Sequence, residues 1–317
     1  MERFYQRFDK MNDDIMARHE NTILLGDCRD RLHDLDDDSV ASCITSPPYW
    51  GCRDYGVAGQ IGIEENPLDY VTELANVFDI VQRKLERSGN LFIIIDDIWI
   101  SNWTRRGDRA WVSSLTMKEG ESSEDFREEC NFQRNWSKDI RKKPGMAWFK
   151  AKQKMMLPER MAIEMQEHHG WFFREKLIWY KPNVGNYTNA RDRFAHAFEY
   201  ILHFTRSQDY YADMDSIRED SGKLRRDVIS IPIERTRSDH PATFPAELAR
   251  LLIGFSCPES SIVLDPFCGS GTTLVVASAM KRKYIGIELS EIYHEIAERR
   301  LKEKNKSLIS SLDNFLH

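Results

Sequence analysis

Short apolar runs bounded by turn residues recur along the chain and predict buried strands. The runs lie at 22–25, 40–45, 91–95, 176–180, 198–204, 262–264 and 284–287. Runs of this kind, apolar at nearly every position, are typical of a sheet that is covered on both faces.

Segments with helical periodicity lie between these runs. In 69–85 the residues Val71, Leu74, Ala75 and Phe78 recur at helical spacing, and the helix is expected to end before Ser88 and Gly89. Similar patterns lie at 158–168, 245–255, 272–280 and 292–301. Strands that alternate with helices predict a doubly wound α/β fold with a mostly parallel sheet.

Residues 101–154 break this alternation. They follow a clear strand, have no strong period and hold four tryptophans among charges of both signs. A structureless loop of this length is rare inside a compact domain, so we expect an inserted region between a first part at 21–100 and a second at 155–305. A second irregular stretch lies at 208–240.

Composition favours a globular protein. The 317 residues are 41% hydrophobic and 30% charged, which is enough for a core. No apolar run reaches 18 residues and the first residues have no signal core, so we expect a cytoplasmic protein without a membrane span. The six cysteines show no CxxC spacing, so we expect free thiols and no metal site.

A glycine-rich turn follows the strand at 262–264. The sequence DPFCGSGTT at 265–273 reads as a tight turn that opens a helix, and its glycines let the backbone approach a ligand closely. No lysine follows Gly271, which disfavours a P-loop and nucleotide hydrolysis. Glu288 ends the next strand, where an acidic residue is placed to bind ribose hydroxyls. A purely structural turn is the alternative.

The sequence TSPPYW at 45–50 follows the strand at 40–45. Two prolines make the turn rigid at a strand's carboxyl end, where open α/β sheets place their active sites. Ser46 offers a hydroxyl, Pro47 a carbonyl, and Tyr49 and Trp50 offer planes for stacking. The turn suits a planar base that carries an amine, although a stiff loop without function is the alternative.

The two motifs together resemble the DNA amino-methyltransferases that modify N4 of cytosine or N6 of adenine. Their order, with the catalytic motif first, resembles the permuted β-type arrangement. The resemblance implies a permuted class I, Rossmann-like, S-adenosylmethionine-dependent methyltransferase fold. Its catalytic half would occupy 21–100, the insert at 101–154 would recognise DNA, and 155–305 would include the cofactor-binding loop. Further similar segments are LLGDC at 24–28, KLIWYKPN at 176–183, HAFEYILHF at 196–204, HPATFPAEL at 240–248 and YIGIELS at 284–290.

The resemblance also implies roles for individual residues. The methionine part of S-adenosylmethionine would lie among Asp265, Phe267, Gly269, Gly271 and Thr272, and its carboxylate near Thr243, Phe244 and Pro245. Glu288 would bind the ribose, and Asp27 would receive the adenine amino group. The catalytic residues would be Ser46, Pro47, Pro48 and Tyr49, with Ser46 and Pro47 holding the target amine and Tyr49 stacking on the base.

The catalytic turn favours direct methyl transfer to an exocyclic amine. Methylation at carbon 5 of cytosine needs a thiolate in a Pro-Cys setting, and the only adjacent pair, Cys257-Pro258, is reversed. Family members with Ser at the first motif position lean to N4 of cytosine, and those with Asp or Asn to N6 of adenine. We therefore expect N4-cytosine methylation after base flipping, with N6-adenine as the alternative.

Positive charge is concentrated locally, although the net charge is −6. The stretch 138–154 interleaves lysines and Arg141 with Trp136, Trp148 and Phe149 nearby, a composition that contacts phosphates and bases. A solvated face paired with the preceding acidic residues is the alternative. The expected DNA contacts are Trp50, Arg53, Lys138, Arg141, Lys142, Lys143, Arg191 and Arg193.

Several alternatives stay open. Related turns serve RNA or a protein glutamine amide, and a non-catalytic, DNA-binding partner of a restriction-modification system would keep the same fold. Asp96 and Asp97 end a strand and either contact substrate or cap a turn. The expected partners are double-stranded DNA and a cognate restriction endonuclease, in a monomer or homodimer.

Overall fold

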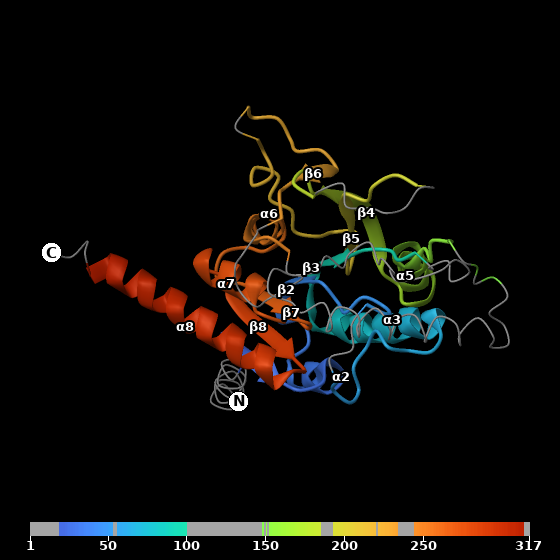
Figure 1. Ribbon diagram of the computed structural model, residues 1–317. Coiled ribbons are helices and arrows are strands. Elements are labelled where there is room, and N and C mark those ends of the chain that lie inside the picture. Colours follow the sequence, from blue (N-terminus) through green and yellow to red (C-terminus); the bar gives the residue numbers. More distant parts are fainter. Residues whose placement is uncertain are drawn as a thin grey trace, which may run out of the picture.

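A single eight-stranded sheet organises the part of the chain that the structure describes (Figure 1). The computed structural model describes residues 19–52, 56–99, 148, 150, 152–184, 193–219, 221–233 and 244–313, with side chains to residue 303. The strands lie in the order β1-β8-β7-β2-β3-β5-β4-β6. Their bounds are β1 Thr22–Leu25, β2 Val40–Thr45, β3 Leu85–Ile95, β4 Phe172–Tyr180, β5 Phe198–Thr205, β6 Val228–Ser230, β7 Ile262–Asp265 and β8 Lys283–Glu288.

Most neighbouring strands run parallel. β1, β8, β7, β2 and β3 pair in parallel, β5 is antiparallel to both β3 and β4, and β6 is parallel to β4. The carboxyl ends of β2, β3, β7 and β8 therefore meet at one edge of the sheet, where ligands bind in folds of this type.

Helices cover both faces of the sheet, as the apolar strands require. Their bounds are α2 Cys28–Arg31, α3 Pro67–Lys84, α5 Leu157–His168, α6 Ala246–Ser256, α7 Thr272–Ala279 and α8 Glu291–Asp313, with a short 3₁₀ turn at Leu32–Asp34. One core cluster packs α2, α3 and α5 against the sheet, and the other packs α6, α7 and α8 (Figure 1). β2 lies between them and is buried at all its positions.

The fold expected from the sequence is confirmed, and the differences are local. β3 begins at Leu85, directly after α3, so Ser88 and Gly89 lie within a strand and do not end the helix as a turn. A register shift between β2 and β3 accommodates this polar stretch. Neither α2 nor β6 was expected from the sequence, because four- and three-residue elements are too short to show a period.

The expected insert lies mostly outside the described residues, but its two ends are described. Trp99 and Lys154 form an isolated antiparallel bridge, and the Met155 amide donates to the Ile98 carbonyl at 3.1 Å. The chain therefore leaves β3 and returns toward α5 at adjacent points, and the eight strands of the sheet pair without a break between them.

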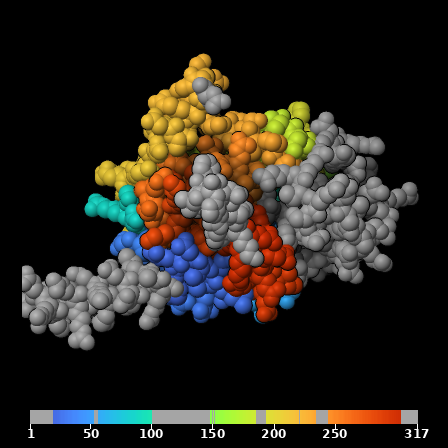
Figure 2. Space-filling view, turned by 90° about the vertical axis from the view of Figure 1, so that its left-hand side faces the viewer, coloured from blue at the N-terminus to red at the C-terminus, as the bar shows by residue number. Residues whose placement is uncertain are grey.

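The segment that links β5 to β6 stands out from the body in both views (Figures 1 and 2). It begins on the sheet, where the Tyr211 amide donates to Ser88 O at 3.0 Å, and the Asp213 amide donates to Phe255 O of α6 at 2.8 Å. Apart from β6, its described residues form no helix or strand, in agreement with the irregular stretch expected at 208–240. Within the described part of the chain, no helix is long and apolar enough to cross a membrane.

Gly286 in β8 is expected to be essential for packing. A Cβ there would lie 2.5 Å from Leu274 Cδ1 of α7 and 3.0 Å from Cys268 Sγ. Gly286→Ala should therefore lower the free energy of unfolding by about 1–3 kcal/mol through overpacking. Urea denaturation measures this change.

Gly254→Ala in α6 is the matched control. A Cβ at Gly254 would meet its nearest atom at 3.4 Å, an ordinary contact. Because Ala favours a helix interior over Gly by about 1 kcal/mol, this variant should be neutral or more stable. Equal decreases in stability in both variants would contradict the packing assignment.

Candidate active site

The Ser-Pro-Pro-Tyr turn lies directly after β2 and is held in place by contacts with α3 and with the segment around Gly62. The hydroxyl of Tyr70 in α3 donates to the Pro48 carbonyl at 2.9 Å. Gly62 packs against the turn, because a Cβ at this position would lie 3.2 Å from Tyr49 O, and its own φ is 101°. The Gly51 amide donates to Gly62 O at 2.7 Å. These contacts fix the turn more firmly than the two prolines alone would.

Trp50 is part of this brace and not a DNA contact. Its side chain is 1% exposed, and its indole N–H donates to the Glu64 carbonyl at 3.0 Å. The expectation that Trp50 contacts DNA is therefore wrong. Nothing in the sequence beside a catalytic turn separates an open aromatic ring from a buried one.

Asp265 joins the catalytic strand to the expected cofactor loop. Its carboxylate, in a residue that is 2% exposed, accepts from Thr45 Oγ1 and Thr273 Oγ1, each at 2.6 Å. It also accepts from the Phe267 amide at 3.2 Å. Burial raises the pKa of Asp265, and these hydrogen bonds oppose the rise only in part, so the pKa is about 6. The backbone pairing of β2 with β7 stops at Cys43, so this side chain continues the connection to the active edge.

The glycine loop after β7 is open at one position and closed at another. Gly269 has a φ of 51°, and nothing lies within 4 Å of a Cβ built there. At Gly271, with a φ of 80°, a Cβ would lie 3.0 Å from Ala297 Cβ of α8. The loop thus presents free space at Gly269 and is packed against α8 at Gly271.

Glu288 and Arg300 hold the loop in place. Glu288 accepts from the Gly269 amide and from the Ser290 amide, both at 2.8 Å, and burial raises the pKa of Glu288. Arg300 of α8 donates to Ser270 O at 2.6 Å, to Ser270 Oγ at 2.8 Å and to the Thr272 hydroxyl at 3.3 Å. The sequence reasoning missed Arg300, because it lies in the last helix, far from the motif along the chain.

Asp27 caps α2 and is engaged by Arg29. The Arg29 Nε donates to Asp27 Oδ1 at 2.9 Å, and Nη2 lies 2.5 Å from Oδ2. Burial raises the pKa of Asp27, but the hydrogen bonds from Arg29 outweigh it and hold the pKa below its usual value. Arg29 also donates to the Gly59 carbonyl at 2.6 Å and contacts Glu73 of α3. It therefore ties Asp27 to the segment that follows the catalytic turn.

Tyr49 is half-buried and its hydroxyl points at Glu199 of β5. The Tyr49 hydroxyl donates to Glu199 Oε2 at 2.8 Å, and Lys181 Nζ binds the other carboxylate oxygen. Burial, together with the charges of Glu199 and Asp96, raises the pKa of Tyr49 well above its usual value, so the phenol keeps its proton. Lys181 and Glu199 lie in the segments KLIWYKPN and HAFEYILHF, but neither residue was expected to act at the site.

The two aspartates at the end of β3 have separate roles. Asp97 Oδ1 accepts from the Ile98 amide at 3.0 Å and from the Leu157 amide at 3.2 Å, where α5 begins. Asp97 therefore caps the turn after β3 and the first amide of α5. Asp96 is 3% exposed, and both its oxygens lie 2.9 Å from His196 Nε2.

The other expected site residues divide into two groups. Phe244 and Pro245 lie at the start of α6, and Phe244 is buried in the core on that side of the sheet. The Arg193 guanidinium lies 4.6 Å from the ring centroid of Trp99, next to Phe194, which is 99% exposed. Outside the described residues lie Arg53, Lys138, Arg141, Lys142, Lys143, Arg191 and Thr243.

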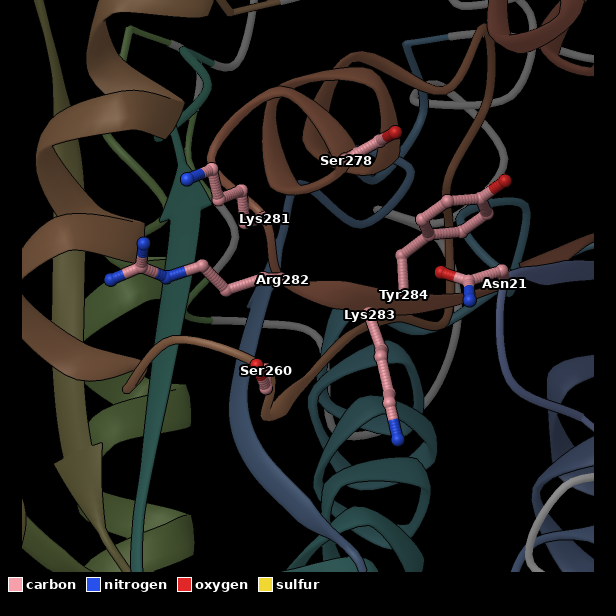
Figure 3. Close-up of a pocket in the computed structure, with 7 residues that line it drawn as sticks. All are labelled: Asn21, Ser260, Ser278, Lys281, Arg282, Lys283 and Tyr284. Carbon is pink, nitrogen blue, oxygen red and sulfur yellow. The ribbon is translucent and has the colours of Figure 1, made fainter. Parts of the chain in front are cut away.

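A depression of about 410 Å³ lies at the opposite edge of the sheet (Figure 3). Lys283 begins β8, so the depression is at the amino ends of the strands and away from the glycine loop. Arg282 and Lys283 point in different directions (Figure 3). Arg282 donates to Cys257 O and Lys283 pairs with Glu20 at 2.8 Å, so these cations already have partners. The depression is lined by Asn21, Ser260, Ser278, Lys281, Arg282, Lys283 and Tyr284.

Comparison with known proteins identifies the family. A family model described as a DNA methylase, named for N6 and N4 methyltransferases, matches residues 40–299. The chain belongs to this DNA methylase family and is a DNA methyltransferase. It is 35% identical over 285 residues to the Type II methyltransferase M.SmaI of Serratia marcescens, covering 88% of this chain and 90% of that protein. It is 34% identical over 292 residues to the Type II methyltransferase M.Cfr9I of Citrobacter freundii, covering 91% and 90%.

Solved structures share the fold. The PvuII DNA methyltransferase, described as cytosine-N4-specific, aligns with a TM-score of 0.64 at 19% identity, covering 89% of this chain and 86% of that one. M1.HpyAVI in complex with SAM aligns with a TM-score of 0.53 at 18% identity, covering 88% and 98%. The permuted methyltransferase fold expected from the two motifs is thereby confirmed.

The buried Asp265 carboxylate should make stability depend on pH in a defined direction. Because its folded pKa of about 6 lies above the usual 3.8, the unfolded chain loses this proton at lower pH than the folded chain does. This group therefore reduces stability as pH rises from about 4 to about 7, by on the order of 3 kcal/mol.

Asp265→Asn isolates this effect. Urea denaturation at a series of pH values gives the free energy of unfolding of both proteins. The wild-type value minus the Asn value should fall as pH rises from about 4 to about 7. A constant difference over this range would show that the carboxyl titrates normally.

Proposed function

We propose that this protein transfers a methyl group from S-adenosylmethionine to N4 of a cytosine in duplex DNA. The observation that carries the proposal is the Asp265 carboxylate, which joins Thr45, the residue before Ser46, to the glycine loop at 2.6 Å. This link brings the amine-holding turn and the cofactor loop to the same edge of the sheet.

The residues at the glycine loop fit S-adenosylmethionine. The open space at Gly269 admits a ligand against the backbone, and the Glu288 carboxylate, held by two amides, can accept further hydrogen bonds from ribose hydroxyls. The SAM complex of the similar M1.HpyAVI supports the same cofactor here. Asp265 would then act by shaping the loop through Thr273 and Phe267. Phe244 and Pro245, with Thr243 from outside the described residues, would lie near the cofactor carboxylate.

The adenine end of the cofactor is expected beside Asp27. Both oxygens of Asp27 bind Arg29, but each carboxylate oxygen has two lone pairs and accepts more than one hydrogen bond. Arg29 orients the carboxylate and also holds Gly59, so the segment after the catalytic turn would form one wall of this part of the pocket.

The catalytic turn supplies orientation and not a strong base. An exocyclic amine conjugated to its ring is a poor nucleophile. The Ser46 hydroxyl and the Pro47 carbonyl would accept its two N–H bonds and leave its lone pair facing the cofactor. When bound, S-adenosylmethionine would supply an electrophilic methyl group and leave as the neutral thioether. The amine nitrogen would accept the methyl group, and the N–H proton that it loses would pass by way of the Ser46 hydroxyl to water.

The base assignment rests on the turn. Ser46 offers an uncharged acceptor, which in this family leans to cytosine, and the PvuII enzyme with the same fold is described as cytosine-N4-specific. N6-adenine methylation is the second candidate and uses the same mechanism. A non-catalytic DNA-binding partner would not need the Asp265 link between a complete catalytic turn and an open cofactor loop.

The expected partners are duplex DNA and, because M.SmaI and M.Cfr9I are Type II methyltransferases, a cognate restriction endonuclease. The contact of the Arg193 guanidinium with the Trp99 ring, which lies just beyond the end of β3, supports a role for Arg193 in binding DNA. Phe194, fully exposed next to it, adds an apolar surface of the kind that contacts bases. The basic residues at 138–143 remain the proposed phosphate contacts.

The first test of the proposal is the product. The protein, given duplex DNA and S-adenosylmethionine, should produce N4-methylcytosine, detected by digesting the DNA and separating the nucleosides before mass analysis. Ser46→Ala should lower kcat by roughly 100-fold, by analogy with the removal of one positioned hydrogen-bond partner, and leave cofactor affinity unchanged. N6-methyladenine would replace the base assignment, and C5-methylcytosine would exclude the mechanism.

A second test concerns the basic stretch. If Lys142 and Lys143 bind phosphates, changing both to Ala should weaken DNA binding and reduce the salt slope of log Kd by about one unit for each phosphate that is no longer neutralised. Lys302→Ala is the control, because Lys302 lies on α8 and pairs with Glu298 at 2.9 Å. An unchanged slope in the double variant would favour a solvated face for this stretch.

A further inference from the structure

The hydroxyl of Tyr49 is held by an ion pair between Lys181 and Glu199, which lie at the ends of the neighbouring strands β4 and β5. Glu199 lies at the start of β5, and Lys181 directly follows β4, so neither belongs to the catalytic turn. Glu199 accepts the Tyr49 hydroxyl on Oε2 at 2.8 Å and Lys181 on Oε1. The side chains of Lys181 and Glu199 are 13% and 12% exposed, so the pair is largely removed from water.

We infer that Glu199, kept in place by Lys181, is a positioning residue that fixes the Tyr49 ring for stacking on the flipped base. The inference rests on the proposed function and holds for cytosine and adenine alike. A carboxylate with a permanent ion-pair partner is a fixed acceptor, and a charge-assisted hydrogen bond to it is short and directional. The ring is therefore oriented before DNA arrives, which lowers the cost of ordering it on binding.

A purely structural role for the ion pair is the competing explanation. The β4–β5 hairpin is already joined by a backbone ladder that runs without interruption from Glu175 to Tyr180, opposite Phe198, and the Lys181 amide donates to Ala197 O at 2.8 Å. The end of the hairpin is thus closed by backbone bonds, and the ion pair adds little to that closure. For the Tyr49 hydroxyl, by contrast, Glu199 is the charged acceptor, with the Ser46 hydroxyl nearby.

The test is a double-mutant cycle on methylation kinetics. Lys181→Met with Glu199→Leu replaces the ion pair by apolar side chains of similar size, which generally preserves stability, and removes the acceptor of Tyr49. Tyr49→Phe keeps the ring and removes the hydroxyl. We expect each change to lower kcat on the order of tenfold, and their combination to lower it no further. Cofactor affinity, measured by calorimetry, should stay at the wild-type value.

A matched control separates this role from the general removal of a lysine–glutamate ion pair in this part of the sheet. Lys176 of β4 pairs with Glu159 of α5 at 2.9 Å. Lys176→Met with Glu159→Leu makes the same chemical change a few residues earlier in the chain, within β4, and it should leave kcat unchanged.

Two kinetic results would overturn the inference. One is a combined decrease of roughly 100-fold, since independent effects multiply. The other is wild-type kcat in the Lys181→Met, Glu199→Leu variant. A crystal structure of that variant needs no activity and should show Tyr49 rotated from its wild-type position; an unmoved ring also overturns the inference.

A wild-type protein that methylates no DNA would instead refute the proposed function, while the crystallographic comparison still decides the role of Glu199. If the paired variant fails to fold, the crystallographic comparison is made on Tyr49→Phe, whose ring should rotate from its wild-type position because it has lost the hydroxyl that Glu199 accepts; an unmoved ring overturns the inference.

Discussion

The active edge of this methyltransferase depends on one buried carboxylate. Backbone pairing between β2 and β7 ends at Cys43 and Leu264, short of the catalytic turn. Beyond that point Asp265 makes the connection, because its two oxygens bind hydroxyls from β2 and from α7. The carboxylate is costly to bury, and its pKa of about 6 reflects that cost. Its hydrogen bonds set the distance between the Ser-Pro-Pro-Tyr turn and the glycine loop.

Around this link, the site is built from residues that hold other residues. Tyr70 and Gly62 brace the catalytic turn, Arg300 and Glu288 brace the glycine loop, and Arg29 orients Asp27. Each brace comes from a different element, so the geometry of the edge depends on the whole sheet and on helices of both faces. Methyl transfer to a weakly nucleophilic amine relies on orientation, so the residues that contact the reacting groups must be held rigidly.

The fold and the two motifs could be predicted from the sequence because both depend on local patterns. Apolar runs placed seven of the eight strands found among the described residues, and short motifs placed the turn and the loop at strand ends. The braces were missed, since Tyr70, Glu199 and Arg300 act across long separations and no periodicity marks them. Trp50 was misread for a related reason: a tryptophan beside a catalytic turn is equally suited to stack on a base or to fill the core beneath. The two roles are distinguished only by the folded structure, in which Trp50 lies in the core cluster with α3 and donates to the Glu64 carbonyl.

The pairing of β1 with β8 has a consequence for how the molecule forms. Thr22 pairs with Ile285, so the first described strand finds its sheet neighbour near the far end of the chain. β2 likewise pairs on one side with β7, which is synthesised much later. During synthesis the early strands must remain without these neighbours until nearly all of the chain has left the ribosome. Such distant pairing slows folding and exposes strand edges, so this protein should fold late and as one unit and benefit from chaperones.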